Sequence, residues 1–422
     1  MSQSPAGPTD APLPPVAGEG RWDDTGGPRL TRAADRRPPS PGGRGGRFRL
    51  RRPRLTHAAV LLLGLLPALA GYGLWRVERD HPLWLRPALW RTAPPAPVRT
   101  PLPRLVLAFH YPWYGTPAGP TRRWRHWNHA RLALPGGRIL GFHDPRREAG
   151  PGRLDLGATH YPAGGPYDSR DPRLARAQIE AARAAGLDGF VVSWWGRESE
   201  ETAGFAALLA AARGTGLRLA PYYEAGELWP RGGPGVAADL EALLDRHGPD
   251  PGWLRVDAAP VVLVYGAHRV RPPVWEYVRR RLATAGRRVY LIGDAASPAW
   301  MPHFDALHVY TPVTFLARGR DVAAEYRARA DAARAAGLPF MAAVAPGFDD
   351  RTIRQPGTVV PRAGGALYDA TWRAALAADP AWVLVASWNE WHEGSEIEPS
   401  REHGTRYLEA TRVWAERFRA RL

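Results

Sequence analysis

The sequence predicts an α/β protein whose main domain is a (β/α)8 TIM-type barrel, preceded by a single transmembrane helix and a disordered N-terminal tail. Three observations support this interpretation. Eight short apolar runs alternate with segments of helical periodicity from residue 104 onward. Nearly every run ends in aromatic, acidic or amide residues. A long apolar stretch near the N-terminus directly follows a cluster of arginines.

The eight apolar runs are interpreted as strands buried on both faces, because they are nearly continuous in apolar, β-branched or aromatic residues. They span residues 104–113, 187–195, 217–224, 259–266, 287–294, 304–312, 339–350 and 382–391. Helices are expected near residues 172–185, 200–214, 236–247, 273–285, 320–336, 366–378 and 405–421. Parallel strands that alternate with helices in this number predict a closed barrel over residues 104–422. The connection of residues 114–170 is unusually long, and long loops are commonly functional.

The part of the chain before the barrel divides into three segments. Residues 1–54 are rich in Arg, Pro and Gly and lack hydrophobic periodicity, which predicts a disordered cytoplasmic tail. Residues 55–75 contain no Asp, Glu or Arg and are long enough for a transmembrane signal anchor, since about 20 apolar residues cross a bilayer. Residues 76–103 form a Pro-rich linker. The arginines before the anchor predict a single-pass membrane protein with its barrel outside the cytoplasm; cleavage near Ala70 would instead release a secreted protein.

The formal net charge of +16 invites a nucleic-acid interpretation, which we reject. All 57 basic residues are arginine and none is lysine, a pattern that strong codon bias produces without any anionic partner. No basic strip interleaved with aromatic residues is present, as a groove for a nucleic-acid backbone would need. The chain also has no cysteine, which excludes disulfides, thiolate metal sites and thiol nucleophiles.

The densest group of chemically reactive residues is the SWNEWHEG block of residues 387–394, at the end of the eighth run. Glycoside hydrolysis uses two carboxyl groups, held about 5–5.5 Å apart in retaining enzymes and about 6.5–9.5 Å apart in inverting ones. A helical turn after Glu390 would bring Glu393 within about 5–6 Å of it at Cβ. We therefore expect Glu390 and Glu393 to be catalytic. Helix capping is the alternative, but the tryptophans and the histidine around them are costly in a solvated loop.

Aromatic residues at the strand ends fit a carbohydrate, because sugar rings present apolar C–H faces that stack on Trp and Tyr. The candidates are Trp113, Tyr114, Trp124, Trp127, Trp194 and Trp195. About half of them are expected to pack the top of the barrel instead of contacting a sugar.

Six sequence blocks carry a resemblance to a known family. They are FHYPWYG (109–115), HWNH (126–129), GATHYPAGGPYDSRDP (157–172), AGLDGFVVSWW (185–195), VAPGFDDRTIR (344–354) and SWNEWHEGSEIEPS (387–400). In this order, and over roughly residues 104–421, the chain resembles glycoside hydrolase family 99, which includes endo-α-mannosidases and endo-α-mannanases.

The resemblance implies a retaining mechanism without the usual covalent glycosyl-enzyme. The glutamate that matches Glu390 acts as a base on the sugar 2-hydroxyl, whose oxygen attacks the anomeric carbon to form a 1,2-anhydro sugar. The glutamate that matches Glu393 protonates the leaving group and then activates water. Tyr310 and His160 match positions expected near the cleaved sugar, and Asp349 and Arg354 are expected to organise the same site. No metal or other cofactor is implied.

The strand ends and the shared blocks together predict the substrate-binding residues. They are Tyr111, Trp113, Tyr114, His126, Trp127, His160, Tyr161, Trp194, Trp195, Glu224, Tyr310, Asp349, Arg354, Trp388, Asn389 and His392. Two features depart from the family pattern. Ser395-Glu396 replaces the Thr-Gln that endo-α-mannosidases usually carry, and the Trp/His-rich segment 122–138 is distinctive. Both departures bear on the substrate more than on the chemistry.

The expected function is that of a retaining, endo-acting α-glycosidase on mannose-containing or related extracytoplasmic glycans. An oligo- or polysaccharide substrate and the lipid bilayer are the expected partners, and we expect a monomer. The alternative is a glycan-binding protein or a transferase of cell-surface polysaccharide assembly that uses the same cleft. The intact Glu390 and Glu393 favour a hydrolase over a binding protein, and a transferase would be expected to carry a diphosphate-metal motif such as Asp-x-Asp.

Overall fold

Eight parallel strands close into a barrel in the computed structural model, which describes residues 102–225, 232–294 and 296–420. They are β1 (Leu105–His110), β6 (Gly189–Trp194), β7 (Arg218–Tyr223), β9 (Ala259–Val264), β10 (Tyr290–Gly293), β11 (Ala306–His308), β12 (Phe340–Val344) and β16 (Trp382–Val385). Each strand pairs with the next in this order, and β16 pairs with β1 to close the ring, with Leu105 opposite Trp382. The eight strands predicted from the apolar runs are therefore confirmed.

The strands are buried on both faces because successive side chains point alternately to two apolar layers. On β1, Leu107 and Phe109 belong to the cluster inside the barrel. Val106 and Ala108, on the same strand, belong to the larger cluster between the strands and the helices. This alternation explains why the runs read as nearly continuous in apolar residues.

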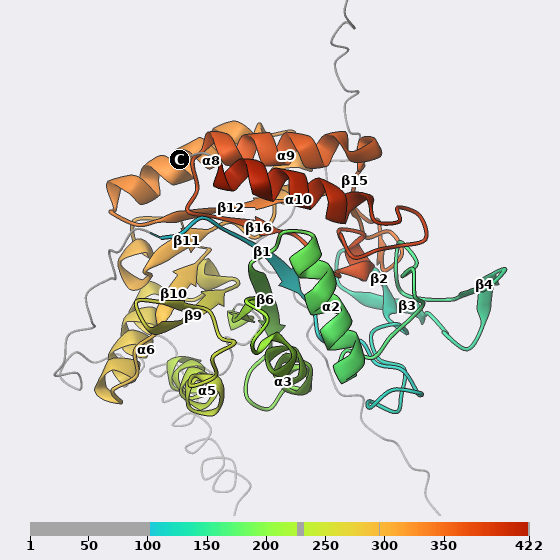
Figure 1. The fold of residues 1–422 in the computed structure, drawn as a ribbon, viewed down its shortest axis with the longest axis horizontal. Coiled ribbons are helices and arrows are strands. Elements are labelled where there is room, and N and C mark those ends of the chain that lie inside the picture. Colours follow the sequence, from blue (N-terminus) through green and yellow to red (C-terminus); the bar gives the residue numbers. More distant parts are fainter. Residues whose placement is uncertain (1–101, 226–231, 295, 421–422) are drawn as a thin grey trace, which may run out of the picture.

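Helices cover the outside of the barrel (Figure 1). They are α2 (Pro172–Ala184), α3 (Glu201–Ala212), α5 (Gly232–His247), α6 (Pro272–Thr284), α8 (Val322–Ala335), α9 (Ala366–Ala377) and α10 (Arg406–Arg419), with the single turn α7 (Val313–Leu316) before α8. Asp171 caps α2 by accepting a hydrogen bond from the Arg173 N–H, and Asp321 caps α8 in the same way through Ala323. The seven predicted helices are all present. Between β10 and β11 the described residues contain the 3-10 turn η5 (Met301–His303) in place of an α-helix.

Two long connections meet beside the strand ends. The β1–α2 connection contains β2 (Ala130–Ala133), β3 (Arg138–Phe142), β4 (Glu148–Gly150) and β5 (Arg153–Leu154). The β12–α9 connection contains β13 (Phe348–Asp349), β14 (Arg354–Gln355), β15 (Val359–Val360) and the 3-10 turn η6 (Ala363–Gly365). Strand β2 pairs with both β3 and β14, so the two connections share one small sheet. The short strand β8 (Arg255–Val256) precedes β9, and the 3-10 turn η4 (Ala267–Arg269) follows it.

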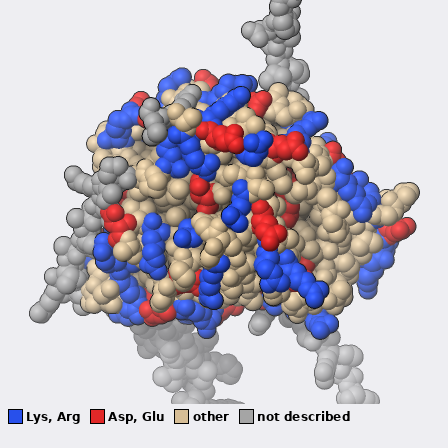
Figure 2. All heavy atoms as spheres, in the orientation of Figure 1, with Lys and Arg blue, Asp and Glu red and all other residues tan. Residues whose placement is uncertain are grey.

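The predicted tail, anchor and most of the linker lie outside the described residues. Among the residues that the structure does describe, no helix is both long and apolar enough to cross a membrane. On the face in view in Figure 2, arginine and acidic side chains are interspersed instead of forming a continuous basic strip.

Candidate active site

The turn after β16 carries both predicted catalytic glutamates. The chain continues from β16 to Glu390, makes the 3-10 turn η7 (Trp391–Glu393), and reverses at Gly394, which has a φ of +54°. A Cβ atom at position 394 would lie 2.9 Å from Cγ2 of Thr159, so both the backbone conformation and the space favour glycine. The returning segment is fixed to the outgoing one by the hydrogen bond from the Ser387 N–H to the Ser395 carbonyl, at 2.8 Å.

Glu390 is buried, with 3% of its surface exposed. Its N–H donates to Oγ of Ser387 at 2.7 Å, which fixes the backbone, while its Oε1 has no hydrogen-bond partner among the described residues. Burial, the nearby charge of Glu393 and that of Glu224 raise the pKa of Glu390 well above its ordinary value, against the opposing effect of Arg354. The carboxyl group is therefore a strong base with one oxygen available to a ligand.

Glu393 is more accessible, with 19% of its side chain exposed. Its Oε1 accepts a hydrogen bond from Nη1 of Arg354 at 2.9 Å, and the same nitrogen lies 2.7 Å from Oδ2 of the buried Asp350. Burial lowers the pKa of Arg354, but Glu393 and Asp350 raise it more, so Arg354 stays a cation. Asp350 is itself fixed because its Oδ1 accepts the N–H of Thr358 at 2.6 Å.

Asn389, Tyr111 and Tyr310 build the inner wall next to the two carboxyl groups. The Asn389 side chain accepts from the Tyr111 N–H at 2.7 Å and donates to the Tyr111 carbonyl at 3.0 Å. The hydroxyl groups of Tyr111 and Tyr310 lie 2.5 Å apart. Burial raises the pKa of Tyr310 well above its ordinary value, and the charges of Glu393 and Glu390 raise it further. The structure thus brings these predicted residues together around the glutamates.

Predicted histidines form a second wall. His126 stacks on Trp113, with ring centroids 4.7 Å apart and planes 1° apart. The His392 ring lies 5.6 Å from His126 and 4.5 Å from His129. Nδ1 of His392 donates to the Gly157 carbonyl, and its buried Nε2 has no partner among the described residues. Burial lowers the pKa of His392, and that of His126 to about 3, so both rings are neutral near pH 7.

A polar chain from the ends of β6 and β7 reaches the same region. Oγ of Ser193 donates to Oε1 of Glu224 at 2.7 Å and accepts from Nε1 of Trp195 at 3.1 Å. The charge of Glu224 contributes to the raised pKa of Glu390, which places the two carboxyl groups within electrostatic reach. In the described residues, no group of three or more His, Cys, Asp and Glu side chains is arranged to hold a metal ion.

Other predicted residues have packing positions. Trp194 is 1% exposed and donates from Nε1 to Oγ1 of Thr202 on α3, outside the barrel. Trp127 is buried and stacks on the buried Tyr114, with centroids 4.2 Å apart. Trp388 packs edge-to-face on Phe190 in the core. Of the six aromatic candidates for sugar stacking, Trp113, Trp124 and Trp195 remain partly exposed.

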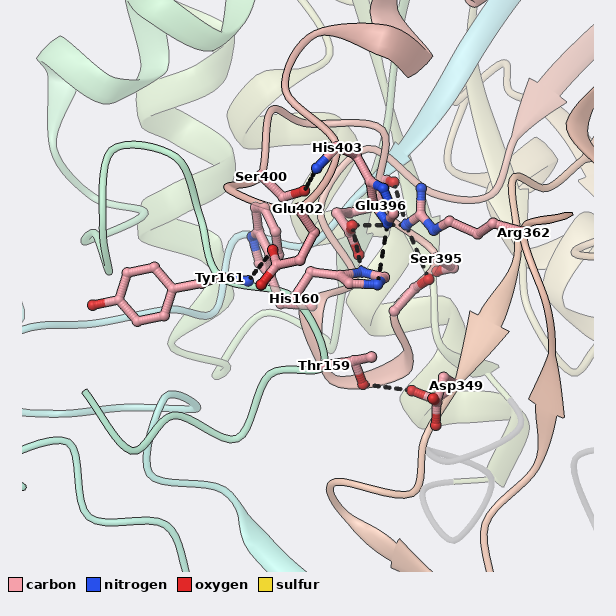
Figure 3. Close-up of polar contacts among 12 residues, drawn as sticks. Thr159, His160, Tyr161, Asp349, Arg362, Ser395, Glu396, Ser400, Glu402 and His403 are labelled. Carbon is pink, nitrogen blue, oxygen red and sulfur yellow. Dashed lines mark hydrogen bonds and ion pairs between the residues drawn. The ribbon is translucent and has the colours of Figure 1, made fainter. Parts of the chain in front are cut away.

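Three further predicted residues have side chains engaged by the protein. Nδ1 of His160 lies 2.9 Å from Oε1 of Glu396 and its Nε2 lies 3.2 Å from Nε2 of His403, so both ring nitrogens have protein partners (Figure 3). Asp349 binds the guanidinium group of Arg351. The Tyr161 ring points away from this group and lies under two arginines, Arg153 and Arg401.

Five residues that the sequence analysis did not predict belong to the hydrogen-bond networks around the turn that carries Glu390 and Glu393. They are Tyr167, Gln178, Arg362, Glu396 and Glu398. Tyr167 and both glutamates stand within the quoted sequence blocks, so the blocks themselves were the available signal. Gln178 and Arg362 lie outside those blocks and had no such signal.

Comparisons with known proteins identify the family of the chain. The profile of glycosyl hydrolase family 99 matches residues 101–295 and 301–420. A glycoprotein endo-alpha-1,2-mannosidase of Mus musculus is 26% identical over 355 residues, covering 75% of this chain and 76% of that protein. A glycoprotein endo-alpha-1,2-mannosidase-like protein of Homo sapiens is also 26% identical, covering 74% of this chain and 75% of its own.

Among solved structures, the GH99 endo-alpha-mannosidase from Bacteroides thetaiotaomicron has a similar fold. The TM-score is 0.64 at 23% identity, covering 76% of this chain and 98% of that one. The family profile spans the barrel strands, the two long connections and the turn with Glu390 and Glu393. The chain therefore belongs to glycosyl hydrolase family 99, and it is a glycoside hydrolase similar to endo-α-mannosidases.

Proposed function

We propose that this protein is a retaining, endo-acting α-glycosidase that cleaves mannose-containing or related glycans. One observation carries the proposal: Glu390 and Glu393 share a single turn, one buried with an oxygen open to a ligand and the other held by Arg354. The names of the relatives, endo-alpha-1,2-mannosidases, support an α-mannoside as the first substrate to test. The predicted anchor at residues 55–75 supports a position outside the cytoplasmic membrane.

The proposed first step moves two protons. The Glu390 carboxylate takes the proton of the sugar 2-hydroxyl, and the resulting oxygen attacks the anomeric carbon to form a 1,2-anhydro sugar. The glycosidic C–O bond breaks as Glu393 gives its proton to the leaving oxygen. In the second step Glu393 takes a proton from water, which opens the anhydro ring at the anomeric carbon, and Glu390 returns its proton to O2. Two inversions at the same carbon give net retention.

The electrostatics of the site support this division of roles. After the first step Glu390 is neutral and Glu393 is a carboxylate. Burial favours the protonated form of Glu390, and the Glu393 carboxylate that the first step leaves accepts a hydrogen bond from Arg354 at 2.9 Å. The surroundings therefore stabilise the protonation state that the first step produces, which lowers the barrier to reaching it.

Four side chains near the turn would bind the sugar, of which the two tryptophans are partly exposed and the other two are buried. Trp113 and Trp195 offer ring faces for stacking, and Nε2 of His392 offers an acceptor for a hydroxyl group. Glu224 lies close enough to influence the charge of Glu390 and would bind a further hydroxyl.

The experiment incubates the full-length protein with a panel of α-mannosides and mannose-containing glycans. Wild type, Glu393→Gln and Glu416→Gln are compared, the last being an exposed pair member on α10. We expect wild type and Glu416→Gln to release fragments whose reducing end first appears as the α-anomer by NMR, and Glu393→Gln to release none. Binding without release across the whole panel would replace the hydrolase proposal with a glycan-binding function.

A further inference from the structure

The β2–β3 hairpin exposes a group of apolar side chains at the end of the barrel that carries the two glutamates. Ile139, Leu140 and Phe142 are 52%, 38% and 61% exposed. Among the described residues only one other large apolar side chain, Val413 of α10, is exposed, at 36%. Isolated exposed apolar residues are ordinary on protein surfaces, whereas a contiguous group marks a surface that contacts another molecule.

The same segment of the chain is basic. Residues 131–147 contain four arginines and one aspartate, which gives a net charge of +3 with histidine neutral. Arg146 is paired with the neighbouring aspartate. The other three, Arg131, Arg138 and Arg147, are exposed and form no ion pair with any residue that the structure describes. The hairpin therefore combines apolar side chains with positive charges that the protein itself does not neutralise.

The hairpin is attached to the edge of the active site. Strand β2 pairs with β14, where Arg354 lies opposite Leu132, and Arg354 contacts Glu393. Strand β3 is at the edge of this small sheet, in the order β14-β2-β3. In Figure 1, β2, β3 and β4 lie together on the side of the molecule away from α5 and α6. A surface that binds the hairpin is therefore brought next to the rim of the active site.

Two kinds of partner fit this hairpin poorly. A strand of a second copy is disfavoured because a register irregularity between Arg131 and Leu132 distorts the hairpin, and bulges and edge charges oppose pairing between sheet edges. Arg138 stands at the start of the edge strand, so two copies would bring like charges together. A glycan is disfavoured because Ile139 and Leu140 are aliphatic and lack the flat ring faces on which sugars stack.

A lipid bilayer matches both properties of the surface. Apolar side chains enter the boundary between headgroups and acyl chains. Arginines bind anionic headgroups while their aliphatic stems stay near the apolar region. The predicted anchor at residues 55–75 supplies a bilayer on the same chain.

The predicted linker is long enough for the hairpin to reach that bilayer. Residues 76–103 number 28, and a Pro-rich chain extends about 3.1 Å per residue, which gives a reach of roughly 90 Å. The linker ends before β1, at the opposite end of the barrel from the hairpin. A strand of six residues such as β1 is only about 20 Å long. The linker can therefore pass along the barrel and leave the hairpin facing the membrane.

We propose that the β2–β3 hairpin docks on the surface of an anionic phospholipid bilayer. Ile139, Leu140 and Phe142 insert at the boundary between headgroups and acyl chains, and the three unpaired arginines bind lipid phosphates. The docked hairpin holds the rim of the active site at the membrane surface. The inference rests on the proposed position of the protein outside the cytoplasmic membrane for the choice of bilayer.

The test measures whether the hairpin touches lipid in the full-length protein. The chain has no cysteine, so Ile139→Cys provides a single site for an environment-sensitive fluorophore. Val413→Cys is the matched control, because Val413 is also an exposed apolar residue but lies on α10. Both proteins are reconstituted into vesicles of equal parts phosphatidylcholine and phosphatidylglycerol that carry a quencher on the acyl chains. We expect strong quenching of the label at position 139 and weak quenching at position 413.

Further variants of the labelled protein separate the charged and the apolar contributions. Arg138→Gln should lower the ratio of docked to undocked hairpin about fivefold, the contribution of one arginine near an anionic surface. Vesicles of phosphatidylcholine alone should lower it further, because no anionic headgroup remains. Phe142→Ser removes the most exposed of the three apolar side chains and should lower quenching in both kinds of vesicle. These substitutions are at exposed positions, so the melting temperature should stay unchanged and confirm that each variant is folded.

Four outcomes would overturn the inference. Equally weak quenching at positions 139 and 413 in protein that floats with the vesicles would leave the anchor and remove the docking. Protein that does not float with the vesicles would refute both. Shielding of the label that grows with protein concentration, without lipid quenching, would assign the hairpin to a second copy of the chain. Shielding that requires an added mannooligosaccharide would assign it to a glycan. No step measures hydrolysis, so failure of the docking and failure of the proposed activity are distinguishable.

Discussion

Replacing Glu398 with glutamine tests a hydrogen-bond network behind the catalytic turn. Oε2 of Glu398 accepts the hydroxyl of Tyr167 at 2.7 Å, and Oε1 accepts Nε2 of Gln178 at 2.7 Å. The Tyr167 oxygen in turn accepts Nδ2 of Asn389 at 3.1 Å and Nε1 of Trp391 at 2.9 Å. Asn389 and Trp391 are the two neighbours of Glu390 in the chain, so this network fixes the backbone on both sides of the proposed base.

The magnitude follows from the pKa of Glu398. Burial raises it from 4.5 to about 7, although hydrogen bonds from Gln178 and Tyr167 act in the opposite direction. Between pH 4.5 and 7 the folded protein therefore binds a proton that the unfolded chain has released. The free energy of unfolding must fall as the pH rises through this window, and the loss is complete above pH 7. At about 1.4 kcal/mol per pKa unit, the loss amounts to roughly 3 kcal/mol.

The assay is urea unfolding of the full-length wild type and Glu398→Gln at pH 4.5 and at pH 8. Glutamine does not titrate, so the variant should lack this part of the pH dependence. At pH 4.5 it should be less stable by about 1 kcal/mol, because its amide cannot accept both hydrogen bonds. At pH 8 it should be the more stable protein. Parallel pH dependences in the two proteins would refute the reasoning, and Glu416→Gln, an exposed residue, serves as the control.

Three further predictions concern the same face of the barrel. Arg354→Gln removes the charged donor to Glu393, and kcat should fall about 10- to 100-fold at similar KM, since such a hydrogen bond is worth about 1.5–3 kcal/mol; an unchanged kcat would contradict the assigned contact. Trp194→Ala should lower the free energy of unfolding by about 3–5 kcal/mol, whereas Trp113→Ala should mainly raise KM; denaturation and kinetics separate the two. Gly394→Ala should lower the melting temperature and kcat together, because its φ is +54°; an unaffected melting temperature would show that the turn adapts.

The sequence was sufficient to predict the eight barrel strands and the seven long helices, but not the short strands of the two long connections. Parallel strands that are buried on both faces are nearly continuous in apolar residues, and the outer helices repeat apolar residues with a period of about 3.6. Both patterns can be recognised in the sequence. The turn with Glu390 and Glu393 was predictable because its residues are contiguous. The contacts that organise it were not, because they join distant residues. Arg354 is 39 residues from Glu393, and His160 is 236 residues from Glu396. Nothing local in the sequence records which loops will meet.

Strand parity explains which aromatic residues line the site. On β6, Val191 lies inside the barrel, while Phe190, Val192 and Trp194 face the helices. Ser193 and Trp195 therefore continue the inner series, and they bind each other. Trp194 was grouped with Trp195 as a predicted binding residue because two adjacent tryptophans at a strand end look alike, whereas they point to opposite faces and Trp194 packs against the helices.

The same parity holds on two more strands and gives the site its inner wall. On β1, Leu107, Phe109 and Tyr111 lie in the inner cluster, and His110 faces outward to Gln178 of α2. On β7, Tyr222 lies inside, and Tyr223 faces outward and donates to Asp239 of α5. Tyr111 and Glu224 then continue the inward series and meet near Glu390, which raises the pKa of Tyr111 together with burial and Tyr310.

Parity stops being informative at β16. Trp382 and Leu384 lie inside the barrel, yet Trp388, which the same series would place inside, packs with the outer cluster. The reactive carboxyl groups therefore depend on the turn and on the contacts of Arg354 and Arg362, not on the strand. The barrel positions the side chains that would bind the sugar, and the β12–α9 connection contacts Glu393, the proposed acid, through Arg354. Changes in that connection can thus alter the chemistry while the barrel and its inner wall stay the same.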